Sequence, residues 1–458
     1  MTALMLVQAA AEQLEQARQS LDTSLPERLL GLVGIGAMLG IAYLLSANRR
    51  RVNWRLVGMG VLLQGVFGVI VLKTAVGQAL FRFVNAVFIR LLGFTTDGAA
   101  FIFGNLVYDN VPVGMPVGSP PESSAIEAAE TVANTGASFA FAVLPTIIFF
   151  ASLMSVLYYL GVMQWIVRGI AWVMRRTMGT SGAETLSVAG NIFVGPTEAP
   201  LLIRPFVGKM TYSELNTVMV GGFATIAGGV MAAYVGMLSR FFPDIAGHLL
   251  TASVMNAPAA LVISKILMPE VARPETEGAV TLKLERTDAN VIDAAASGAA
   301  QGLRLALNVG AMLLAFIALI QLVNWGVAEL GALVGVADLS LERIFGWVFT
   351  PLAWLMGATA DTATIGSLIG VKMVVNEFVA YSQLATIIGE TPLDPRSTII
   401  ATYALLGFAN FSTIAIQIGG IGGIAPERRS DLSKLGVRAM IGGNLAAFMS
   451  ASLAGMLL

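Results

Sequence analysis

Residues 361–385 read DTATIGSLIGVKMVVNEFVAYSQLA, an apolar segment interrupted by Asp361, Lys372, Asn376 and Glu377. A charged side chain at the centre of a membrane costs roughly 3 kcal/mol on insertion scales and more in simulations, so the segment makes a poor transmembrane helix. A chain that enters and leaves the membrane on one side is tolerated where other protein segments bury it. We therefore predict a re-entrant hairpin here.

A second segment, 181–206, has the same character in the first half of the chain. It is apolar over most of its length, yet it carries two acids, an amide and two prolines that a plain transmembrane helix would not hold. We predict a second re-entrant hairpin here. Its interrupting residues are Glu184, Asn191, Pro196, Thr197, Glu198 and Pro200.

The composition of the whole chain places these hairpins in a membrane protein. Of 458 residues, 56% are hydrophobic and 12% are charged, and the mean hydropathy is +0.78. Soluble domains carry about 25% charged residues. The net charge of −1 argues against nucleic acid as a partner. The absence of cysteine excludes disulfides and zinc–thiolate sites, and a single histidine argues against a Ser-His-Asp triad.

Eight apolar runs are long enough to cross about 30 Å of hydrocarbon. The fold class that follows is an all-α polytopic membrane protein, with about eight transmembrane helices plus two re-entrant hairpins. The runs are 29–47, 55–73, 139–162, 215–238, 246–267, 304–327, 398–422 and 438–458.

The basic residues between these runs orient the chain by the positive-inside rule. If both hairpins return to the side from which they enter, most of the basic residues lie in the cytoplasm and both termini lie outside. The exceptions on the outer side are Arg82, Arg90 and Arg240. The orienting residues are Arg49, Arg50, Arg51, Arg55, Arg168, Arg175, Arg176, Lys265, Arg304, Arg428, Arg429, Lys434 and Arg438.

Four further segments lie outside the predicted spans. Met1–Leu25 has no basic region at its start, so we interpret it as an amphipathic pre-helix and not as a cleaved signal peptide. Residues 76–96 predict an amphipathic helix on the outer surface. Residues 109–136 are rich in Pro, Gly, Ser and Glu and predict an external loop and helix. Residues 269–300 predict a cytoplasmic linker.

The two halves of the chain carry the same landmarks in the same order. The sequence AWVM at 171–174 returns as AWLM at 353–356, and FATIA at 223–227 returns as FSTIA at 411–415. Chance similarity between apolar segments is the alternative. By the charge topology the two hairpins enter from opposite sides, so we predict an inverted repeat. Inverted repeats are typical of secondary transporters, whose binding site lies at mid-membrane between the two halves.

This repeat divides the chain into four parts. Residues 1–138 hold the pre-helix, two peripheral spans, the outer helix and the external loop. Residues 139–268 form the first repeat, with span three, an interfacial helix, the first hairpin, and spans four and five. Residues 269–300 are the linker, and residues 301–458 form the second repeat, with span six, an interfacial helix, the second hairpin, and spans seven and eight.

Ionisable groups at membrane depth are candidates for binding a solute. Glu198 and Glu377 lie in the two hairpins, and their ionised oxygens accept hydrogen bonds from hydroxyl or N–H groups. Asn410 and Thr413 are three residues apart and therefore share one helical face. The alternative role for these two is hydrogen bonding between helices.

A hard cation could bind where the fourth span is interrupted. Two glycine pairs, 221–222 and 228–229, bracket Phe223–Ala227, so the helix is expected to unwind around Thr225. Exposed carbonyls there, with Asn191 and Thr225 side chains, could form an oxygen cage. Close packing of the glycines against a neighbouring helix is the alternative.

Three other polar residues have predicted structural roles. Asp361 and Lys372 are expected to pair with each other or to cap the second hairpin. His248 is expected to be an interfacial residue at the outer end of span five and not a proton relay.

Three motifs resemble those of the concentrative nucleoside transporters. The run GVKMVVNEFVAY at 370–381 is similar to that family's signature, in which Asn-Glu-Phe-Val-Ala is the specific element. The stretches GFANFS at 407–412 and SVMNAPA at 253–259 are similar to the family as well. The resemblance extends from about residue 30 to the end of the chain.

The resemblance implies a homotrimer of eight-span protomers in a bacterial inner membrane, with no enzymatic cofactor, that carries nucleosides with sodium or sometimes with protons by an elevator motion. The ribose would be bound by Glu377, Asn410 and Thr413, with Phe408 close by. The base would be bound by Gly195, Thr197 and Glu198. The sodium ligands would be the side chains of Asn191 and Thr225 and the carbonyls of Val194 and Ile226; their retention favours sodium over protons.

One position departs from the family pattern. Pro196 follows Gly195, where the family has Gln, and proline has neither an amide side chain nor a backbone N–H. We therefore predict an intact ribose half and an altered base half. A different solute, such as a modified nucleoside or a nucleobase, carried with sodium or with protons, is the first alternative. An intramembrane enzyme that uses Glu198 and Glu377, and a passive channel, are the others.

Overall fold

The computed structural model describes residues 23–108, 139–276, 288–333, 335–336 and 338–458, and four short strands between residues 110 and 134. The pre-helix predicted for Met1–Leu25 lies almost wholly outside the described residues. What is described is helical apart from those strands. β1 (Asn110–Pro112) pairs with β4 (Val132–Asn134), and β2 (Met115–Pro116) pairs with β3 (Ile126–Glu127), both antiparallel. The described pieces of the predicted external loop and helix are thus strands.

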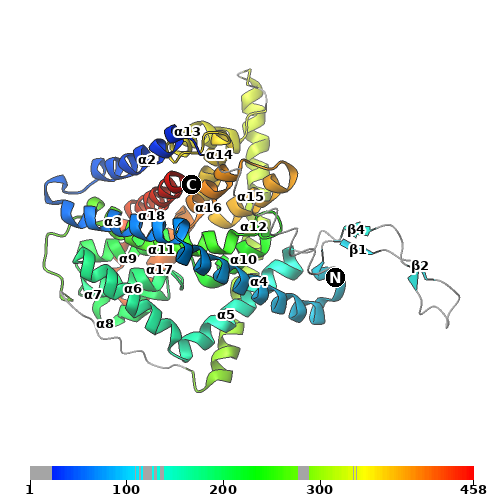
Figure 1. The fold of residues 1–458 in the computed structure, drawn as a ribbon, viewed down its shortest axis with the longest axis horizontal. Helices are drawn as coiled ribbons and strands as arrows, with labels where there is room; N and C mark the ends of the chain where they lie inside the picture. Colours follow the sequence, from blue (N-terminus) through cyan, green and yellow to red (C-terminus); the bar gives the residue numbers. More distant parts are fainter. Residues whose placement is uncertain are drawn as a thin grey trace.

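The helices follow one another along the chain in the arrangement of Figure 1. There are short 3-10 turns at η1 (Arg49–Arg51), η2 (Gly104–Val107), η4 (Ala199–Ile203) and η5 (Pro426–Arg428), and a π turn at η3 (Phe139–Val143). The α-helices are α2 (Leu25–Leu44), α3 (Trp54–Lys73), α4 (Ala75–Phe103), α5 (Leu144–Tyr159), α6 (Val162–Met178), α7 (Gly182–Asn191), α8 (Arg204–Val207), α9 (Tyr212–Ala224), α10 (Gly228–Leu238), α11 (Ile245–Leu267), α12 (Val291–Leu333), α13 (Leu341–Leu355), α14 (Thr362–Val374), α15 (Glu377–Glu390), α16 (Pro395–Leu405), α17 (Phe411–Ile424) and α18 (Arg429–Leu457).

Eight helical stretches of the described chain are long and apolar enough to cross a membrane, which is the predicted number. The eight stretches differ from the predicted spans in two places. The stretch Ala75–Val107, predicted as a shorter helix on the outer surface, has the length and hydropathy of a span. The run 398–422, predicted as one continuous helix, is divided between α16 and α17. For α4, the predicted position on the outer surface of the membrane stays a prediction.

The helix α12 begins earlier than the predicted sixth span. It starts at Val291, so the second part of the expected linker 269–300 is helical. Close packing against α5 explains the extension, because a Cβ at Gly298 would lie 2.6 Å from the Ser155 Cβ, and one at Gly302 would lie 2.7 Å from the Ile148 Cα. Small residues let two helices approach this closely. With 43 residues α12 is about 65 Å long, and it extends past the bundle (Figure 1).

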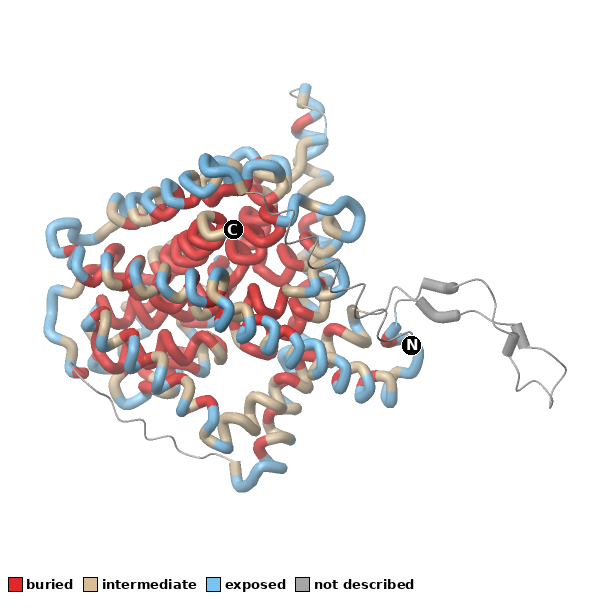
Figure 2. Tube along the Cα trace, in the orientation of Figure 1, coloured by how far each residue is buried: buried red, intermediate tan, exposed pale blue. Residues whose placement is uncertain are grey.

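Burial separates the long helices into an inner and an outer group (Figure 2). Within the most apolar 18 residues of α9–α10 and of α11, 89% of the residues are buried, and in α18 the corresponding share is 83%. In α2, α3, α4, α5 and α12 the corresponding share lies between 11% and 33%. The outer helices therefore surround a densely packed inner group, and the hairpin helix α7 is entirely buried within it.

The inner group contains four places where a helix stops and resumes. α9 ends at Ala224 and α10 begins at Gly228, which confirms the predicted unwinding around Thr225. Both predicted hairpin segments have a helix–break–helix form, consistent with re-entrant hairpins. The breaks lie at 192–198 between α7 and η4, at 225–227 between α9 and α10, at 375–376 between α14 and α15, and at 406–410 between α16 and α17.

The two halves hold their interrupted helices by the same device. Asn256 Nδ2 on α11 donates to the carbonyl of Ala224 at 2.6 Å, where α9 ends. Asn444 Nδ2 on α18 donates to the carbonyl of Ala409 at 2.9 Å, beside the start of α17. The two asparagines are 188 positions apart, the offset that also separates FATIA from FSTIA. This correspondence supports the predicted repeat, whose inverted orientation stays a prediction.

Candidate substrate and ion site

Glu377 begins α15, at the break in the second hairpin. The preceding Asn376 caps this helix, because its Oδ1 accepts the backbone N–H of Val379 at 2.8 Å. The Glu377 side chain is 5% exposed, so its carboxylate is held inside the protein. It accepts hydrogen bonds from Asn410 Nδ2 at 2.8 Å and from the Tyr234 hydroxyl at 3.2 Å.

Asn410 performs the same capping role for α17. Its Oδ1 accepts from the backbone N–H of Thr413 at 2.9 Å and from the Thr413 hydroxyl at 3.0 Å. The structure thus brings together Glu377, Asn410 and Thr413, all predicted for the ribose half. The first turns of α15 and α17 both lie at this cluster. The predicted neighbour Phe408 is half-buried, and its carbonyl accepts the backbone N–H of Asn410 at 2.9 Å.

Lys372 stabilises the other side of the α16–α17 break. Its Nζ, fully buried, donates to the carbonyls of Ala404 at 2.9 Å and Leu406 at 3.0 Å, at the C-terminal end of α16. Of the two alternatives expected for Lys372 and Asp361, pairing with each other is not the contact that Lys372 makes, but its predicted structural role is confirmed. Asp361 stands before α14 without capping it through its side chain, and its Oδ2 accepts the backbone N–H of Asp394 at 3.0 Å.

The first hairpin contributes the predicted base-binding residues from the turn 195–198. The Gly195 carbonyl accepts the backbone N–H groups of Glu198 at 3.2 Å and Ala199 at 3.1 Å. The Glu198 carboxylate folds over Gly195, where a Cβ would lie 2.2 Å from its Oε2, so this conformation needs glycine. The Glu198 side chain is otherwise exposed, in contrast to the buried Glu377.

This turn packs against α9 and α17. A Cβ at Gly222 on α9 would lie 2.8 Å from the Pro196 Cβ, and a Cβ at Gly420 on α17 would lie 2.5 Å from the Thr197 Cγ2. The same helix, α17, therefore carries Asn410 and Thr413 at its start and meets the first hairpin further along. α17 thus connects the two predicted sets, with Asn410 and Thr413 at its start and Thr197 of the hairpin turn packed against Gly420.

The predicted cation ligands lie where two chain breaks meet. Asn191 ends α7 and is completely buried, and its Nδ2 and Oδ1 have no hydrogen-bond partner in the described part of the chain. The backbone N–H of Gly228 donates to the Phe193 carbonyl at 2.9 Å, which joins the turn that contains Val194 to the break after Thr225. Ile226 in this break is fully buried.

The chemistry of these groups suits a hard monovalent cation. A buried amide with unpaired polar atoms costs free energy unless something binds it. The candidate ligands are neutral oxygen atoms. One of them, the Thr225 hydroxyl, donates a hydrogen bond to the Gly221 carbonyl at 2.8 Å and keeps its lone pairs for a cation. Among the described residues, no group of three or more His, Cys, Asp or Glu side chains is placed to bind a metal ion.

A buried ion pair fastens the base of the first hairpin to α11. Lys265 Nζ lies 2.7 Å from Glu184 Oε2 and 3.4 Å from Glu270 Oε2, and it donates to the Ser213 hydroxyl at 2.9 Å. The side chains of Lys265 and Glu184 are only 6% and 1% exposed. Lys265 was predicted only as a cytoplasmic charge that orients the chain.

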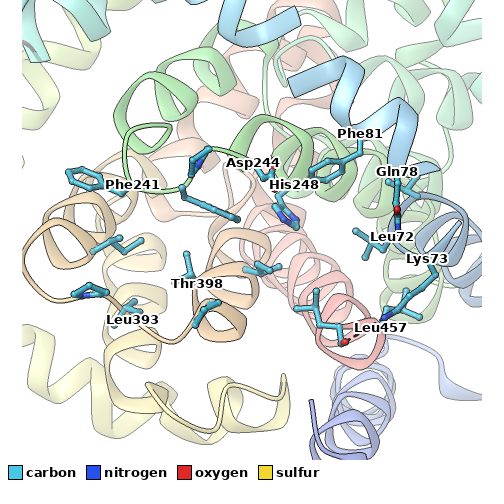
Figure 3. A pocket seen from close by; sticks show the side chains of 18 of the residues that line it. Leu72, Lys73, Gln78, Phe81, Phe241, Asp244, His248, Leu393, Thr398 and Leu457 are labelled. Atoms are coloured by element: carbon cyan, nitrogen blue, oxygen red, sulfur yellow. Dashed lines mark hydrogen bonds between the residues drawn. The ribbon is translucent and has the colours of Figure 1, made fainter. Parts of the chain in front are cut away.

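His248 lies in the first turn of α11 and is buried against aromatic rings, and its position at the membrane interface stays a prediction. It is 7% exposed, and its ring lies 4.9 Å from that of Phe81 and 5.1 Å from that of Phe242, between centroids. It borders a cavity of about 720 Å³ that also includes Lys73 and Asp244 (Figure 3). None of the predicted substrate or ion residues lines this cavity, so we separate it from the candidate site.

Two buried residues near the candidate site were not predicted from the sequence. Tyr234 on α10 reaches Glu377 from the other half of the chain, and no local pattern indicates this contact. Gln417 is fully buried on α17, and its spacing of four from Thr413 is a readable signal for a shared helical face.

Family models match three parts of the chain. Residues 33–106 match the model described as Na+ dependent nucleoside transporter N-terminus. Residues 140–241 match the model described as nucleoside recognition, and residues 248–455 match the model described as Na+ dependent nucleoside transporter C-terminus. An uncharacterized transporter of Haemophilus influenzae is 41% identical over 93% of this chain and 97% of its own length. The chain belongs to the concentrative, Na+ dependent nucleoside transporter family.

Other relatives and solved structures agree with this assignment. Mouse sodium/nucleoside cotransporter 1 is 40% identical over 96% of this chain, which spans 65% of the mouse protein. A structure of CNTnw in an inward-facing substrate-bound state has 40% identity and a TM-score of 0.82, covering 94% of this chain and 97% of that one. A CNTnw variant in an outward-facing state has 39% identity and a TM-score of 0.84, covering 95% and 98%. These comparisons place the chain in a family of membrane transporters.

Proposed function

We propose that the transporter imports nucleosides together with sodium across the inner membrane of a bacterium, by alternating access. The observation that carries this proposal is the convergence of Glu377, Asn410 and Thr413 at the start of α17. An ionised carboxylate accepts hydrogen bonds from two neighbouring hydroxyls, and an amide and a hydroxyl can both donate and accept. The 2′- and 3′-hydroxyls of ribose present a matching pair.

The base would bind further along α17, against the turn 195–198 of the first hairpin. Thr197 and Glu198 supply polar groups there, next to the backbone of Gly195. Pro196 supplies a ring face and no hydrogen bond. We propose that the ribose is read as in the family and that the base preference is altered by this proline.

Sodium would bind at Asn191 and Thr225 and at the carbonyls of Val194 and Ile226. The unpaired amide of Asn191 and the hydrogen bond from Gly228 to Phe193, which packs the two breaks together, support this proposal. Because the same hairpin would hold sodium and the base, binding of the ion would order the substrate site. This arrangement would couple the two solutes.

The division into inner and outer helices supports an elevator form of alternating access. The hairpins and interrupted helices belong to the inner group, which would move against the outer helices. Its relative CNTnw has been solved in inward-facing, outward-facing and intermediate states. The outer helix α12 exposes a large apolar face, including Leu314 at 77% and Trp325 at 68%, which would contact lipid or the neighbouring protomers of a homotrimer.

A second candidate function keeps the fold and changes the solute. Only Pro196 favours it: a modified nucleoside or a nucleobase, carried with sodium or with protons, would explain the loss of the amide from the base half. Retention of the cluster at Glu377 favours a ribose-containing solute.

Uptake of radiolabelled uridine and adenosine into proteoliposomes tests the proposal. We expect accumulation above equilibrium when an inward sodium gradient is applied, and none when potassium replaces sodium. Glu377→Gln removes the charge but keeps the shape, and we expect it to lower uptake at least tenfold. If neither nucleoside accumulates under a sodium or a proton gradient while the protein is folded and inserted, the nucleoside assignment fails.

A further inference from the structure

We propose that Gln417 is a specificity-determining residue, whose side-chain oxygen accepts a hydrogen bond from an amino group on the nucleobase. It supplies from α17 an amide that Pro196 cannot supply from the first hairpin. This inference rests on the proposed nucleoside transport. It concerns a residue that lies outside the predicted set of substrate ligands.

Gln417 lies on the same face of α17 as the ribose cluster. Asn410 caps this helix, and Thr413, Gln417 and Ile421 are its buried residues along one face. At about 1.5 Å of rise per residue, Gln417 is about 6 Å along the axis from Thr413. That separation matches the distance from the ribose ring of a nucleoside to the far edge of its base. A ribose at Thr413 therefore directs the base toward Gln417.

The amide of Gln417 borders the same space as Pro196. A Cβ at Gly222 would lie 2.8 Å from the Pro196 Cβ, 3.0 Å from the Gln417 Nε2 and 3.3 Å from the Gln417 Cδ. One glycine thus separates the proline from the amide. One helical turn further on, Gly420 receives Thr197 of the hairpin. The amide of Gln417 and the hairpin turn therefore both lie beside Gly222 of α9.

The orientation of this amide follows from its one hydrogen bond. Gln417 Nε2 lies 3.2 Å from the carbonyl of Met219, and a carbonyl only accepts, so the nitrogen must face it. The remaining Oε1 is buried and has no hydrogen-bond partner within the described chain. An acceptor buried without a donor is destabilising, and a bound ligand that offers N–H relieves this cost.

The free group is an acceptor, so the ligand group is a donor. Exocyclic amino groups, as on cytosine and adenine, provide such a donor at the edge of the base. Carbonyl oxygens at the same place, as on uracil, would repel Oε1. The chemistry therefore favours aminated bases over their oxo counterparts.

Ligand pairs that differ by one amino group test this directly. Unlabelled cytidine is compared with the riboside of pyrimidin-2-one, and unlabelled adenosine with purine riboside. Each compound competes with the uptake of radiolabelled uridine into proteoliposomes. For the wild type we expect the amino compound to compete about tenfold better in at least one pair, as for one buried hydrogen bond. For Gln417→Met, of similar length and without the amide, we expect the two members of each pair to compete equally.

A matched control is available in Gln64, another fully buried glutamine. Its Nε2 donates to the Ser450 hydroxyl at 2.8 Å, on α3 and away from α17. Gln64→Met loses an amide of the same kind, and we expect it to keep the wild-type preference for the amino compounds. Gln417→Leu serves as a second apolar variant if Gln417→Met does not fold.

The outcomes separate this inference from the proposed function. If the wild type is not inhibited by any of the four nucleosides, nucleoside transport itself fails. If they inhibit the wild type with no difference within either pair, or if the preference survives unchanged in the Gln417 variants, the role of Gln417 is overturned while the proposed function stands.

Discussion

At the scale of single residues, the candidate site contrasts two glutamates. Glu377 is buried and already bonded to Asn410 and Tyr234, so its carboxylate is oriented before any solute arrives. Glu198 is exposed and folds back over Gly195. An oriented carboxylate loses less entropy on binding than a mobile one. We infer that the half proposed to bind ribose is preorganised and that the half proposed to bind the base adjusts to its ligand.

Restoring the family's glutamine at Pro196 should change which base is preferred. Pro196→Gln adds an amide and a backbone N–H next to Gly222, so we expect the ratio of uridine to adenosine uptake to change at least about fivefold. Uptake under a sodium gradient measures this ratio. Pro196→Ala restores the N–H alone and serves as the control. An unchanged ratio in Pro196→Gln would show that this position does not read the base.

At the scale of elements, polar side chains hold the interrupted helices in place. An interrupted helix leaves N–H and C=O groups without partners inside a membrane protein, and these must be satisfied by other donors and acceptors. Asn376 and Asn410 cap the starts of α15 and α17, and Lys372 caps the end of α16. The breaks are therefore built features of the protein, with their own hydrogen-bond partners.

Removing the ammonium of Lys372 should destabilise the second hairpin. Lys372→Met keeps most of the side-chain length but leaves the carbonyls of Ala404 and Leu406 without their donor, so we expect a loss of about 2 kcal/mol or more. Thermal unfolding in detergent would show it as a lower midpoint. Lys209→Met is the matched control, because Lys209 is 69% exposed and its ion pair with Glu275 contributes little. Equal midpoints for the two variants would refute the capping role.

At the scale of the whole molecule, the proposed motion carries the inner helices past the outer ones. Gln64 on the outer helix α3 donates to Ser450 on the inner helix α18 at 2.8 Å, so this pair crosses the boundary between the two groups. The boundary is lined by small residues and apolar side chains, as at Gly60, where a Cβ would meet Val262 of α11 at 2.3 Å. Such a surface can slide only if few hydrogen bonds cross it.

Linking the two groups should stop transport. The chain contains no cysteine, so the double variant Gln64→Cys, Ser450→Cys has two thiols and no others. Mercury(II) bridges neighbouring thiolates, and we expect it to lower uptake at least tenfold in this double variant, with recovery on adding excess thiol. The wild type and each single variant should be unaffected. Full uptake by the bridged protein would mean that α3 and α18 do not move relative to each other.

Composition, hydropathy and charge determined the membrane class, the number of apolar stretches and the two interrupted segments predicted as hairpins, because these depend on local transfer free energies that add along the chain. The motif at 370–381 indicated the family, and local glycine spacing predicted the break at Thr225. Tertiary structure decided the rest. Burial of His248, capping of α16 by Lys372, the contact of Tyr234 with Glu377 and the approach of Gln417 to Pro196 all join segments far apart in sequence. Their energies depend on which faces the packed helices present to one another, and no local pattern in the sequence specifies that choice.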